Sequence, residues 1–291
     1  MMAWDRGDLH GYQHHAVDFI RTRGDCALFL DMGLGKTIST LTAVSDFLDD
    51  FAVSRVLIVA PLRVANTVWA QEALKWTHTK HLDIAVCTGS AENRKAIISS
   101  DPDVMVINRE NIAWLVTIEP WKWDMIVIDE SSSFKSAESK RFKALKKVVK
   151  HIKKTVLLTG TPAPNGQMDL WSQMYLIDQG ARLCRTITNF RNLYFQPSGY
   201  MGYKYELRDG SEDKINDKIK DVCLSMSADD YLELPDRMDI IERVQMPDEV
   251  MRDYKDFERQ FFMELQEGTI EAVSAAVMAG KLLQMSNGAV Y

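Results

Sequence analysis

Short apolar runs alternate with stretches of helical spacing along the first half of the chain. The runs cover residues 28–30, 56–60, 84–87, 104–107, 125–128 and 155–158. Runs of this length, apolar on both faces and separated by helices, are typical of a parallel sheet with helices on both sides. The pattern therefore predicts an α/β fold of three layers around a central, mainly parallel sheet.

The first apolar run leads directly into Asp31-Met-Gly-Leu-Gly-Lys-Thr37, and helical spacing begins at Ile38. A strand, a glycine-rich turn and a helix start in this order aim backbone N–H groups and a helix N-terminus at one point, which suits a polyphosphate. Lys36 would reach the outer phosphates, and the Thr37 hydroxyl would ligate Mg²⁺. Leu30 stands where the GxxxxGK[ST] pattern has its first glycine, and a tight structural turn or the glycine turn of a redox domain is the alternative.

We interpret this stretch as a nucleotide-binding P-loop. A glutamine lies just upstream, in a segment that precedes an amphipathic helix at residues 16–20. Its paired amide donor and acceptor match the edge of an adenine, although a surface position for Gln13 is the alternative. The predicted nucleotide-binding residues are Gln13, Met32, Gly33, Leu34, Gly35, Lys36 and Thr37.

Binding sites in parallel sheets lie at the carboxyl ends of the strands, and every predicted strand here ends in small polar or charged residues. The segments that follow the second to sixth runs are 61–63, 88–90, 108–110, 129–132 and 159–162. In the fourth of these segments, Asp129 can hold Mg²⁺ through its water shell and Glu130 can deprotonate an attacking water. Together with Lys36 and Thr37, they predict a site for a nucleotide and Mg²⁺.

Composition and charge narrow the expected location and partners of the protein. The 291 residues are 46% hydrophobic and 26% charged, with a formal net charge of −6. No apolar run reaches the roughly 18 to 20 residues that span a bilayer, and the polar first twelve residues do not resemble a signal peptide. The four cysteines are scattered and predict reduced thiols. We therefore expect a cytoplasmic protein without a membrane partner, and a local basic face remains compatible with the acidic average.

The most basic stretch lies between residues 134 and 155, where Glu138 is the only acid. Apolar residues at 142, 145, 148, 149 and 152 form one stripe of a helix, so the lysines occupy its outer face. This face is either simply solvated or a contact for a phosphate backbone or a partner.

Beyond Asp178 the alternating pattern ends. We predict an α/β nucleotide-binding domain at residues 1–180 and a mainly helical accessory region at 181–291. The latter contains a short aromatic helix at 190–195, a strand pair around residues 200–210, and helices at 247–265 and 270–285. Tyr200, Tyr203 and Tyr205 would either stack on bases or pack within the hairpin.

Several motifs of this chain resemble the ATPase motifs of superfamily-two helicases. They are Asp31-Met-Gly-Leu-Gly-Lys-Thr37, Asp129-Glu130 and Leu158-Thr-Gly-Thr-Pro162, in this order on alternating strands and helices. The run from Leu158 to Asn165, followed by Asp169-Leu-Trp-Ser172, is similar specifically to the Swi/Snf-type DNA translocases. Leu234-Pro235 and the segment from Lys281 to Met285 also fit that branch, so the similarity extends from about Leu9 to the end.

The resemblance implies a first RecA-like domain whose ATP hydrolysis is stimulated by DNA and drives translocation. It implies ATP and Mg²⁺ as ligands, with Lys36, Asp129 and Glu130 as the catalytic residues and Thr37 and Asp129 at the metal. It assigns Arg63, Thr88, Gly89, Asn108 and Arg109 to the nucleic-acid face, and Thr159, Gly160 and Thr161 to coupling.

The chain departs from the family pattern at four places. A single acid, Asp31, precedes the glycine loop where the family has two, and Ser132 stands in place of the usual coupling histidine. The paired arginines expected near residues 223–227 are absent. The second RecA-like domain, which carries an arginine finger, is also missing before Tyr291, and we expect weak ATPase activity unless that domain acts in cis or in trans. A nucleotide-gated interaction module, or the motor subunit of a restriction or replication assembly, are the alternatives.

Overall fold

The computed structural model describes residues 4–118, 120–198, 204–232, 242, 244–266 and 272–288. The chain forms two compact units, Met1–Leu234 and Pro235–Tyr291. Each unit is a body of its own, and the first contains the sheet with all the segments predicted to form a site.

A seven-stranded parallel sheet lies at the centre of the larger unit, with the strand order β3-β4-β2-β5-β6-β1-β9. The strands are β1 (Cys26–Leu30), β2 (Val56–Ala60), β3 (Ile84–Cys87), β4 (Val104–Asn108), β5 (Met125–Asp129), β6 (Lys154–Thr159) and β9 (Cys223–Met226). The six predicted runs are all strands of this sheet, which confirms the predicted fold class. The seventh strand, β9, pairs with β1 and was not predicted.

Both faces of the sheet are buried, because successive side chains of a strand point to opposite sides. In β2, Val56, Ile58 and Ala60 belong to one hydrophobic core. Leu57 and Val59, which alternate with them, belong to another. Fully apolar runs such as Val-Leu-Ile-Val-Ala are therefore explained by two cores rather than one.

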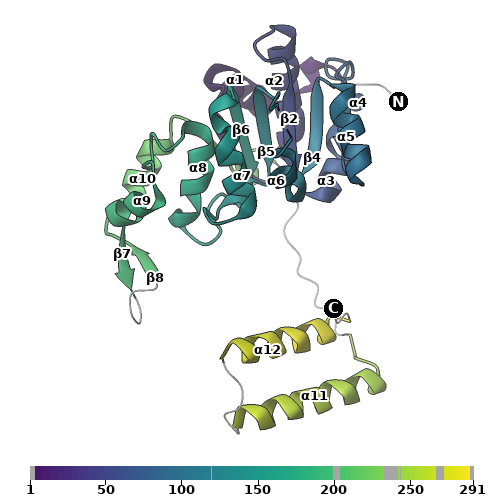
Figure 1. The fold of residues 1–291 in the computed structure, drawn as a ribbon, viewed down its shortest axis with the longest axis vertical. Helices are drawn as coiled ribbons and strands as arrows, with labels where there is room; N and C mark the ends of the chain where they lie inside the picture. Colours follow the sequence, from purple (N-terminus) through teal and green to yellow (C-terminus); the bar gives the residue numbers. More distant parts are fainter. Residues whose placement is uncertain are drawn as a thin grey trace. The chain divides into compact units, whose positions relative to one another are not determined.

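Helices cover the two faces in separate sets (Figure 1). One core includes side chains of α1 (Gly11–Arg23), α2 (Lys36–Asp49), α3 (Leu62–Thr67) and α4 (Trp69–Lys75). The other includes side chains of α5 (Ala91–Ser100), α6 (Ile112–Leu115), α7 (Lys140–Val148) and α8 (Leu170–Asp178). The arrangement is a three-layer sandwich, as the alternation of apolar runs and helical spacing predicted.

The helix α7 follows the predicted stripe. Phe142, Leu145 and Val148 are buried in the core, whereas Lys140, Lys143 and Lys147 are exposed. The basic residues therefore form the outer face of this helix.

The elements within 181–198 and 204–232 belong to the same unit. The helices α9 (Ile187–Tyr194) and α10 (Ser211–Ile219) contribute Phe190 and Ile215 to the core that also contains α8. They and the antiparallel pair β7 (Phe195–Ser198) and β8 (Lys204–Leu207) lie on the opposite side of α8 from α4 and α5 (Figure 1). The predicted division at residue 180 thus does not coincide with the boundary between the two units, which follows Leu234.

The local predictions for this segment hold in part. The aromatic helix predicted at 190–195 corresponds to α9, while the strand pair begins earlier than predicted, at Phe195. Gly210, predicted to lie at a turn, precedes α10 with a positive φ of 66°. Tyr205 is exposed on β8, and Tyr200 and Tyr203 lie outside the described residues.

The smaller unit contains two helices, α11 (Asp248–Gln266) and α12 (Ala272–Ser286), close to the predicted bounds. Leu234-Pro235 lies outside the described residues. Of the helices in the described parts of the chain, none combines the length and the apolar character that a membrane span needs.

Candidate nucleotide-binding site

The glycine loop connects β1 to α2. Gly33 and Gly35 have positive φ angles of 87° and 70°, a conformation that side chains with a Cβ rarely adopt, and α2 begins directly after them at Lys36. Leu34, between the two glycines, is fully buried and anchors the turn, whereas Met32 is 83% exposed. The free N–H groups of the first turn of α2 are thus available to an anion at this edge of the sheet.

Lys36 is held against the loop that precedes it. Its ammonium donates hydrogen bonds to the carbonyl oxygens of Leu30, at 2.7 Å, and Asp31, at 3.0 Å. Burial lowers the pKa of Lys36, while the negative charges of Glu130 and Asp129 oppose that shift. The structure therefore brings the lysine and the acidic pair together, although they are more than ninety residues apart in the sequence.

Asp129 ends β5 and is 9% exposed. Burial, with the nearby charge of Glu130, raises the pKa of Asp129 to about 6. Two donors act in the other direction: the indole N–H of Trp69, 3.2 Å from Oδ2, and the backbone N–H of Glu130, 3.0 Å from Oδ1. A buried carboxylate with this environment is well suited to a cation.

Trp69 was not singled out from the sequence. It lies in α4 and is fully buried, and in the sequence it looks like an ordinary apolar core residue of a helix. Its hydrogen bond to Asp129 joins positions sixty residues apart, and no local pattern predicts such a contact.

Glu130 has φ 51° and ψ 56°, the left-handed conformation that non-glycine residues seldom adopt. It separates β5 from the short 3₁₀ helix Ser131–Phe134. Unusual backbone conformations of this kind cluster at functional sites, where the surrounding structure holds them in place.

A cavity of about 410 Å³ opens beside the glycine loop, and Gln13 of α1 lines it together with Gly33 and Gly35. The Gln13 side chain accepts a hydrogen bond from the His10 N–H at 2.9 Å. A Cβ on Gly35 would overlap Nε2 of Gln13, so a larger residue here would displace the Gln13 side chain in addition to straining the φ angle. Gln13 therefore lies at the predicted nucleotide loop rather than on the open surface.

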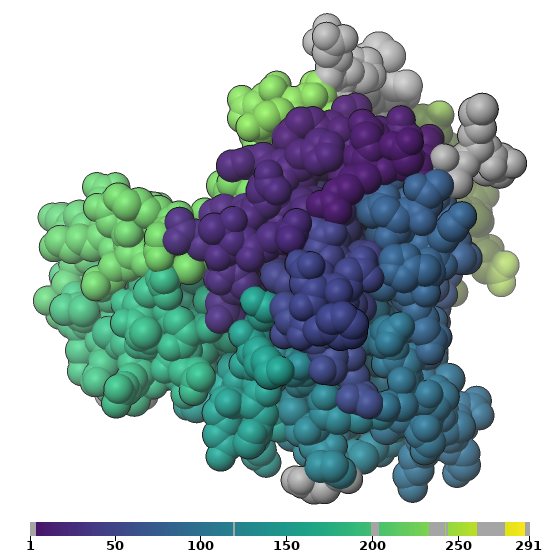
Figure 2. Space-filling view, turned by 90° about the horizontal axis from the view of Figure 1, so that it is seen from above, coloured from purple at the N-terminus to yellow at the C-terminus, as the bar shows by residue number. Residues whose placement is uncertain are grey.

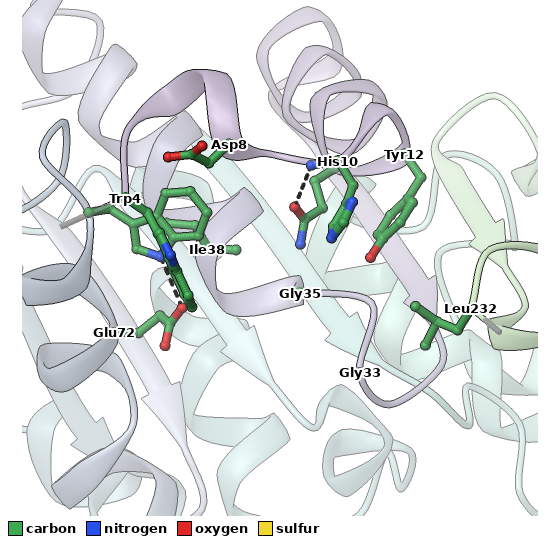
Figure 3. A pocket seen from close by; sticks show the side chains of 11 residues that line it. Trp4, Asp8, His10, Tyr12, Gly33, Gly35, Ile38, Glu72 and Leu232 are labelled. Carbon is green, nitrogen blue, oxygen red and sulfur yellow. Dashed lines mark hydrogen bonds between the residues drawn. The ribbon is translucent and has the colours of Figure 1, made fainter. Parts of the chain in front are cut away.

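Aromatic rings line two walls of this cavity. His10 and Tyr12 stack with ring centroids 5.3 Å apart, and Trp4 meets Trp76 edge to face at 5.1 Å. Figure 3 shows His10 and Tyr12 above the glycine loop and Trp4 with Glu72 to the left of it. Rings placed in this way provide apolar surface for a planar ligand.

The segment after β9 closes one end of the cavity, where Leu232 is part of the lining. Tyr12 contacts Tyr231 with ring centroids 5.2 Å apart, and Figure 2 shows light green residues beside the purple amino-terminal residues. Asp31 accepts a hydrogen bond from the backbone N–H of Ala228 at 2.9 Å. The single acid before the glycine loop is thus used to fix β9 and the segment that follows it.

The residues assigned to nucleic acid lie at the carboxyl ends of β2, β3 and β4, three neighbouring strands. Arg63 is exposed at the start of α3, and the Thr88 hydroxyl donates to the side-chain oxygen of Asn66 at 2.8 Å. Asn108 is only 6% exposed and donates to Glu110, which also pairs with Arg109 at 2.9 Å. Arg63, Thr88, Gly89 and Arg109 are accessible at this edge, whereas Asn108 is positioned to shape the loop.

The residues assigned to coupling follow β6. Thr159 is fully buried, and its hydroxyl oxygen accepts a hydrogen bond from the Thr161 N–H at 3.1 Å. A Cβ on Gly160 would lie 3.3 Å from the carbonyl oxygen of Leu30. This loop therefore lies against the end of β1 and the glycine loop.

The donor atoms present fit Mg²⁺. The Thr37 hydroxyl, at the start of α2, and the Asp129 carboxylate offer the oxygen ligands that this ion prefers. Among the described residues, no group of three or more His, Cys, Asp or Glu side chains could hold a metal ion.

The parallel sheet, the glycine loop and the acidic pair at the end of β5 define the class of this chain, a P-loop α/β domain of RecA-like type. The chain belongs to the SNF2-related domain family, whose match covers residues 12–287.

Two curated relatives show how far this similarity extends. The chain is 36% identical over 292 residues to putative protein p41 of Acyrthosiphon pisum secondary endosymbiont phage 1, covering 96% of this chain and 64% of that protein. It is 31% identical over 188 residues to the CHD3-type chromatin-remodeling factor CHR7 of Arabidopsis thaliana, covering 59% of this chain and 15% of that protein.

Among solved structures, the fold matches the Sulfolobus solfataricus SWI2/SNF2 ATPase core in complex with dsDNA, with a TM-score of 0.65 and 24% identity. That match covers 98% of this chain and 60% of the archaeal chain. The chain thus spans less than two thirds of the length of the proteins it matches here, and the fold agrees with the three-layer architecture predicted from the sequence.

Proposed function

We propose that this chain binds ATP with Mg²⁺ and hydrolyses it as the first motor domain of a DNA translocase. The observation that carries the proposal is the meeting of Lys36, Asp129 and Glu130 beside a glycine loop with two left-handed glycines. Membership in the SNF2-related domain family supports the same function.

In this proposal the glycine loop and the first turn of α2 bind the phosphates. Lys36 exchanges its hydrogen bonds with the Leu30 and Asp31 carbonyls for contacts to the outer phosphates. The cavity beside Gln13 takes the adenine, with His10 and Tyr12 supplying apolar surface. Met32, Gly33 and Leu34 contribute through their backbone.

Glu130 would act as the general base for the attacking water, because it follows Asp129 directly and its negative charge acts on both Asp129 and Lys36. Thr37 and Asp129 would hold Mg²⁺, which when bound neutralises charge on the phosphate oxygens. Asp129 has a raised pKa, so a cation next to it favours its ionised form. Each catalytic group thus has a distinct role.

DNA would cross the carboxyl ends of β2 to β4, where the exposed Arg63 and the partly exposed Arg109, which is paired with Glu110, would meet the phosphates. One solved relative of the same fold was determined in complex with dsDNA. Thr88 and Gly89 would contact the phosphate backbone, and Thr159, Gly160 and Thr161 would couple that face to the nucleotide.

A nucleotide-gated interaction module without turnover is the second candidate. An interaction module of this kind would bind ATP without hydrolysing it. The presence of Lys36, Thr37 and Glu130 in one site favours an active ATPase instead. Steady-state ATP hydrolysis, measured with single-stranded DNA, duplex DNA and RNA as activators, distinguishes the two. ATP binding with no hydrolysis under any of these conditions, or with a second domain added, would contradict the proposed motor.

The DNA path has its own test. Binding should weaken with salt, with log K falling by roughly 0.7 to 0.9 per phosphate contact for each decade of salt. Arg63→Ala and Arg109→Ala should weaken binding of every sequence alike, as expected for backbone contacts. If neither change affects affinity, the path lies elsewhere, and the exposed lysines of α7 are the next face to test by Lys140→Ala with Lys147→Ala.

A further inference from the structure

One buried side chain joins the loop after β5 to the loop after β6. Gln173 of α8 is fully buried, and its Oε1 accepts a hydrogen bond from the Ser131 hydroxyl at 2.8 Å. Its Nε2 donates to the carbonyl oxygens of Pro162, at 2.7 Å, and Asp169, at 3.0 Å. Ser131 directly follows Glu130, and Pro162 directly follows Thr161.

Other contacts at the start of α8 strengthen the same junction. The Ser172 hydroxyl donates to the Phe134 carbonyl at 2.7 Å, and the Asp169 carboxylate accepts a hydrogen bond from the Asn165 N–H at 2.9 Å. Lys135 pairs with Asp169 at 3.7 Å. Both loops are thus fastened to one helix end.

Gln173 differs from these neighbours because it alone contacts the residues next to Glu130 and next to Thr161 with one rigid amide group. A buried polar group that loses its partner is costly, so neither loop can shift without the other or without breaking a buried hydrogen bond. A displacement at Glu130 is therefore passed to residues 159–162.

A second, direct route exists, because Gly160 lies against the backbone of Leu30 and Asp31. That contact begins at the glycine loop, whereas the route through Gln173 begins beside the general base. The two routes can be separated, since Ser131 and Gln173 make no contact with the glycine loop in the hydrogen bonds described above.

We infer that Gln173 is a positioning residue that couples the nucleotide state at Glu130 to the Thr159–Pro162 loop and thereby to nucleic-acid binding. This inference rests on the proposed function. It assigns no chemical step to Gln173, which acts only through Ser131 and Pro162.

The test compares two serine variants. Ser131→Ala removes the hydrogen bond to Gln173, and Ser172→Ala removes a hydrogen bond of similar length from a hydroxyl that is equally buried on the neighbouring position of α8. The readout is the ratio of the Kd values for a short duplex DNA with and without a non-hydrolysable ATP analogue and Mg²⁺. This ratio measures coupling between two binding sites and is insensitive to a uniform loss of stability.

We expect a ratio of at least about fivefold, in either direction, for the wild-type chain and Ser172→Ala, and below about twofold for Ser131→Ala. Affinity for the nucleotide alone should stay within about twofold in both variants, because neither hydroxyl belongs to the proposed ATP site. Gln173→Leu should abolish the coupling as well, with lower thermal stability because Ser131 and Pro162 lose their partner.

Amide hydrogen exchange supplies an independent readout on the same variants. Adding the nucleotide should alter exchange in the peptide that contains residues 159–166 in the wild-type chain and Ser172→Ala, but not in Ser131→Ala. Coupling that persists in Ser131→Ala would overturn the inference and favour the direct route through Gly160. Coupling that is lost equally in Ser172→Ala would also overturn it, because the effect would then not be specific to Gln173.

The outcomes also separate this inference from the proposed function. A wild-type chain that binds neither the nucleotide nor DNA contradicts the proposed function. A wild-type chain that binds both without any coupling leaves the proposed ATP and DNA sites in place and contradicts the coupling roles of Gln173 and of residues 159–161.

Discussion

At the scale of single residues, Lys36 and Glu130 lie in one site but have separable roles. Glu130→Gln should preserve ATP binding and lower turnover by at least about a hundredfold, because it removes the base and spares the phosphate contacts. Lys36→Ala should weaken ATP binding by about tenfold or more, since a charged hydrogen-bond donor to the phosphates is lost. Equilibrium binding and steady-state hydrolysis, measured side by side, check both. Wild-type turnover by Glu130→Gln would contradict the assigned base.

Gly35 tests the packing of the glycine loop. A Cβ at this position would overlap the Gln13 amide, and the positive φ adds roughly 1 to 2 kcal/mol of strain for any residue other than glycine. Gly35→Ala should therefore lower both stability and ATP affinity. Denaturant unfolding and ATP binding provide the measurements.

Gly210→Ala is the matched control, because Gly210 has a similar φ of 66° but open space around it. It should show the backbone strain alone and leave ATP affinity unchanged. In a background of Gln13→Ala, the cost of Gly35→Ala should fall to that of Gly210→Ala. Equal costs in both backgrounds would show that Gln13 does not press on this glycine.

At the scale of elements, Asp124 joins the starts of three neighbouring strands. Its carboxylate accepts hydrogen bonds from the backbone N–H groups of Ser54 and Arg55, both at 3.0 Å, and from the Lys153 ammonium at 3.1 Å. Burial alone would raise the pKa of Asp124, but these donors hold it below its usual range. The ionised carboxylate is thus part of how β2, β5 and β6 are aligned.

Asp124→Asn should lower the free energy of unfolding by about 1 to 3 kcal/mol at neutral pH, because hydrogen bonds to a charged acceptor are lost. Since the folded pKa is depressed, the carboxylate stabilises the fold at pH values above the unfolded pKa near 3.9. That stabilisation disappears as the pH falls through the folded pKa, so the two proteins should converge in acid. Urea unfolding between pH 3 and 7 provides the measurement.

The control is Lys153→Ala, which removes a mostly exposed partner and should lower the free energy of unfolding by less than about 1 kcal/mol. A pH-independent difference between Asp124→Asn and the wild type would contradict this account.

At the scale of the whole molecule, the chain spans 60% of the archaeal ATPase core whose fold it shares. We expect the remaining part of such a protein to supply an arginine at the phosphates, a group typically worth about 10³ to 10⁵ in rate. Residues 1–291 should therefore bind ATP and Mg²⁺ but hydrolyse ATP slowly, with little stimulation by DNA. An extended protein, or the corresponding second part of a relative added in trans, should raise turnover by orders of magnitude. Steady-state ATPase assays of both forms, with and without DNA, test this expectation.

Fast, DNA-stimulated hydrolysis by residues 1–291 alone would contradict it. That result would instead indicate an arginine donated by another copy of the chain.

Most of the sheet could be predicted from the sequence, but one of its strands and the extent of the larger unit could not. Apolar runs such as Val56–Ala60 and Val104–Ile107 predicted six strands and a three-layer fold, because burial on both faces leaves a local signature. The strand β9 was missed, since Cys223-Leu-Ser-Met is less apolar and is only partly buried at the edge of the sheet. Its place beside β1 extends the larger unit well beyond the boundary predicted at residue 180.

The glycine loop with Lys36 and Thr37, the acidic pair at Asp129 and Glu130, and the strands that carry them could all be predicted from the order of residues. These features depend on short spacings, which local backbone geometry translates directly into structure. The strand order and the long-range partners could not be predicted in this way, because they depend on how the elements pack. The contacts of Trp69 with Asp129, of Ser131 with Gln173, and of Asp31 with Ala228 join positions 60, 42 and 197 residues apart. A polar glutamine inside the apolar helix α8 was a signal that a buried partner must exist, but only the packing of that helix against two loops identified the partner.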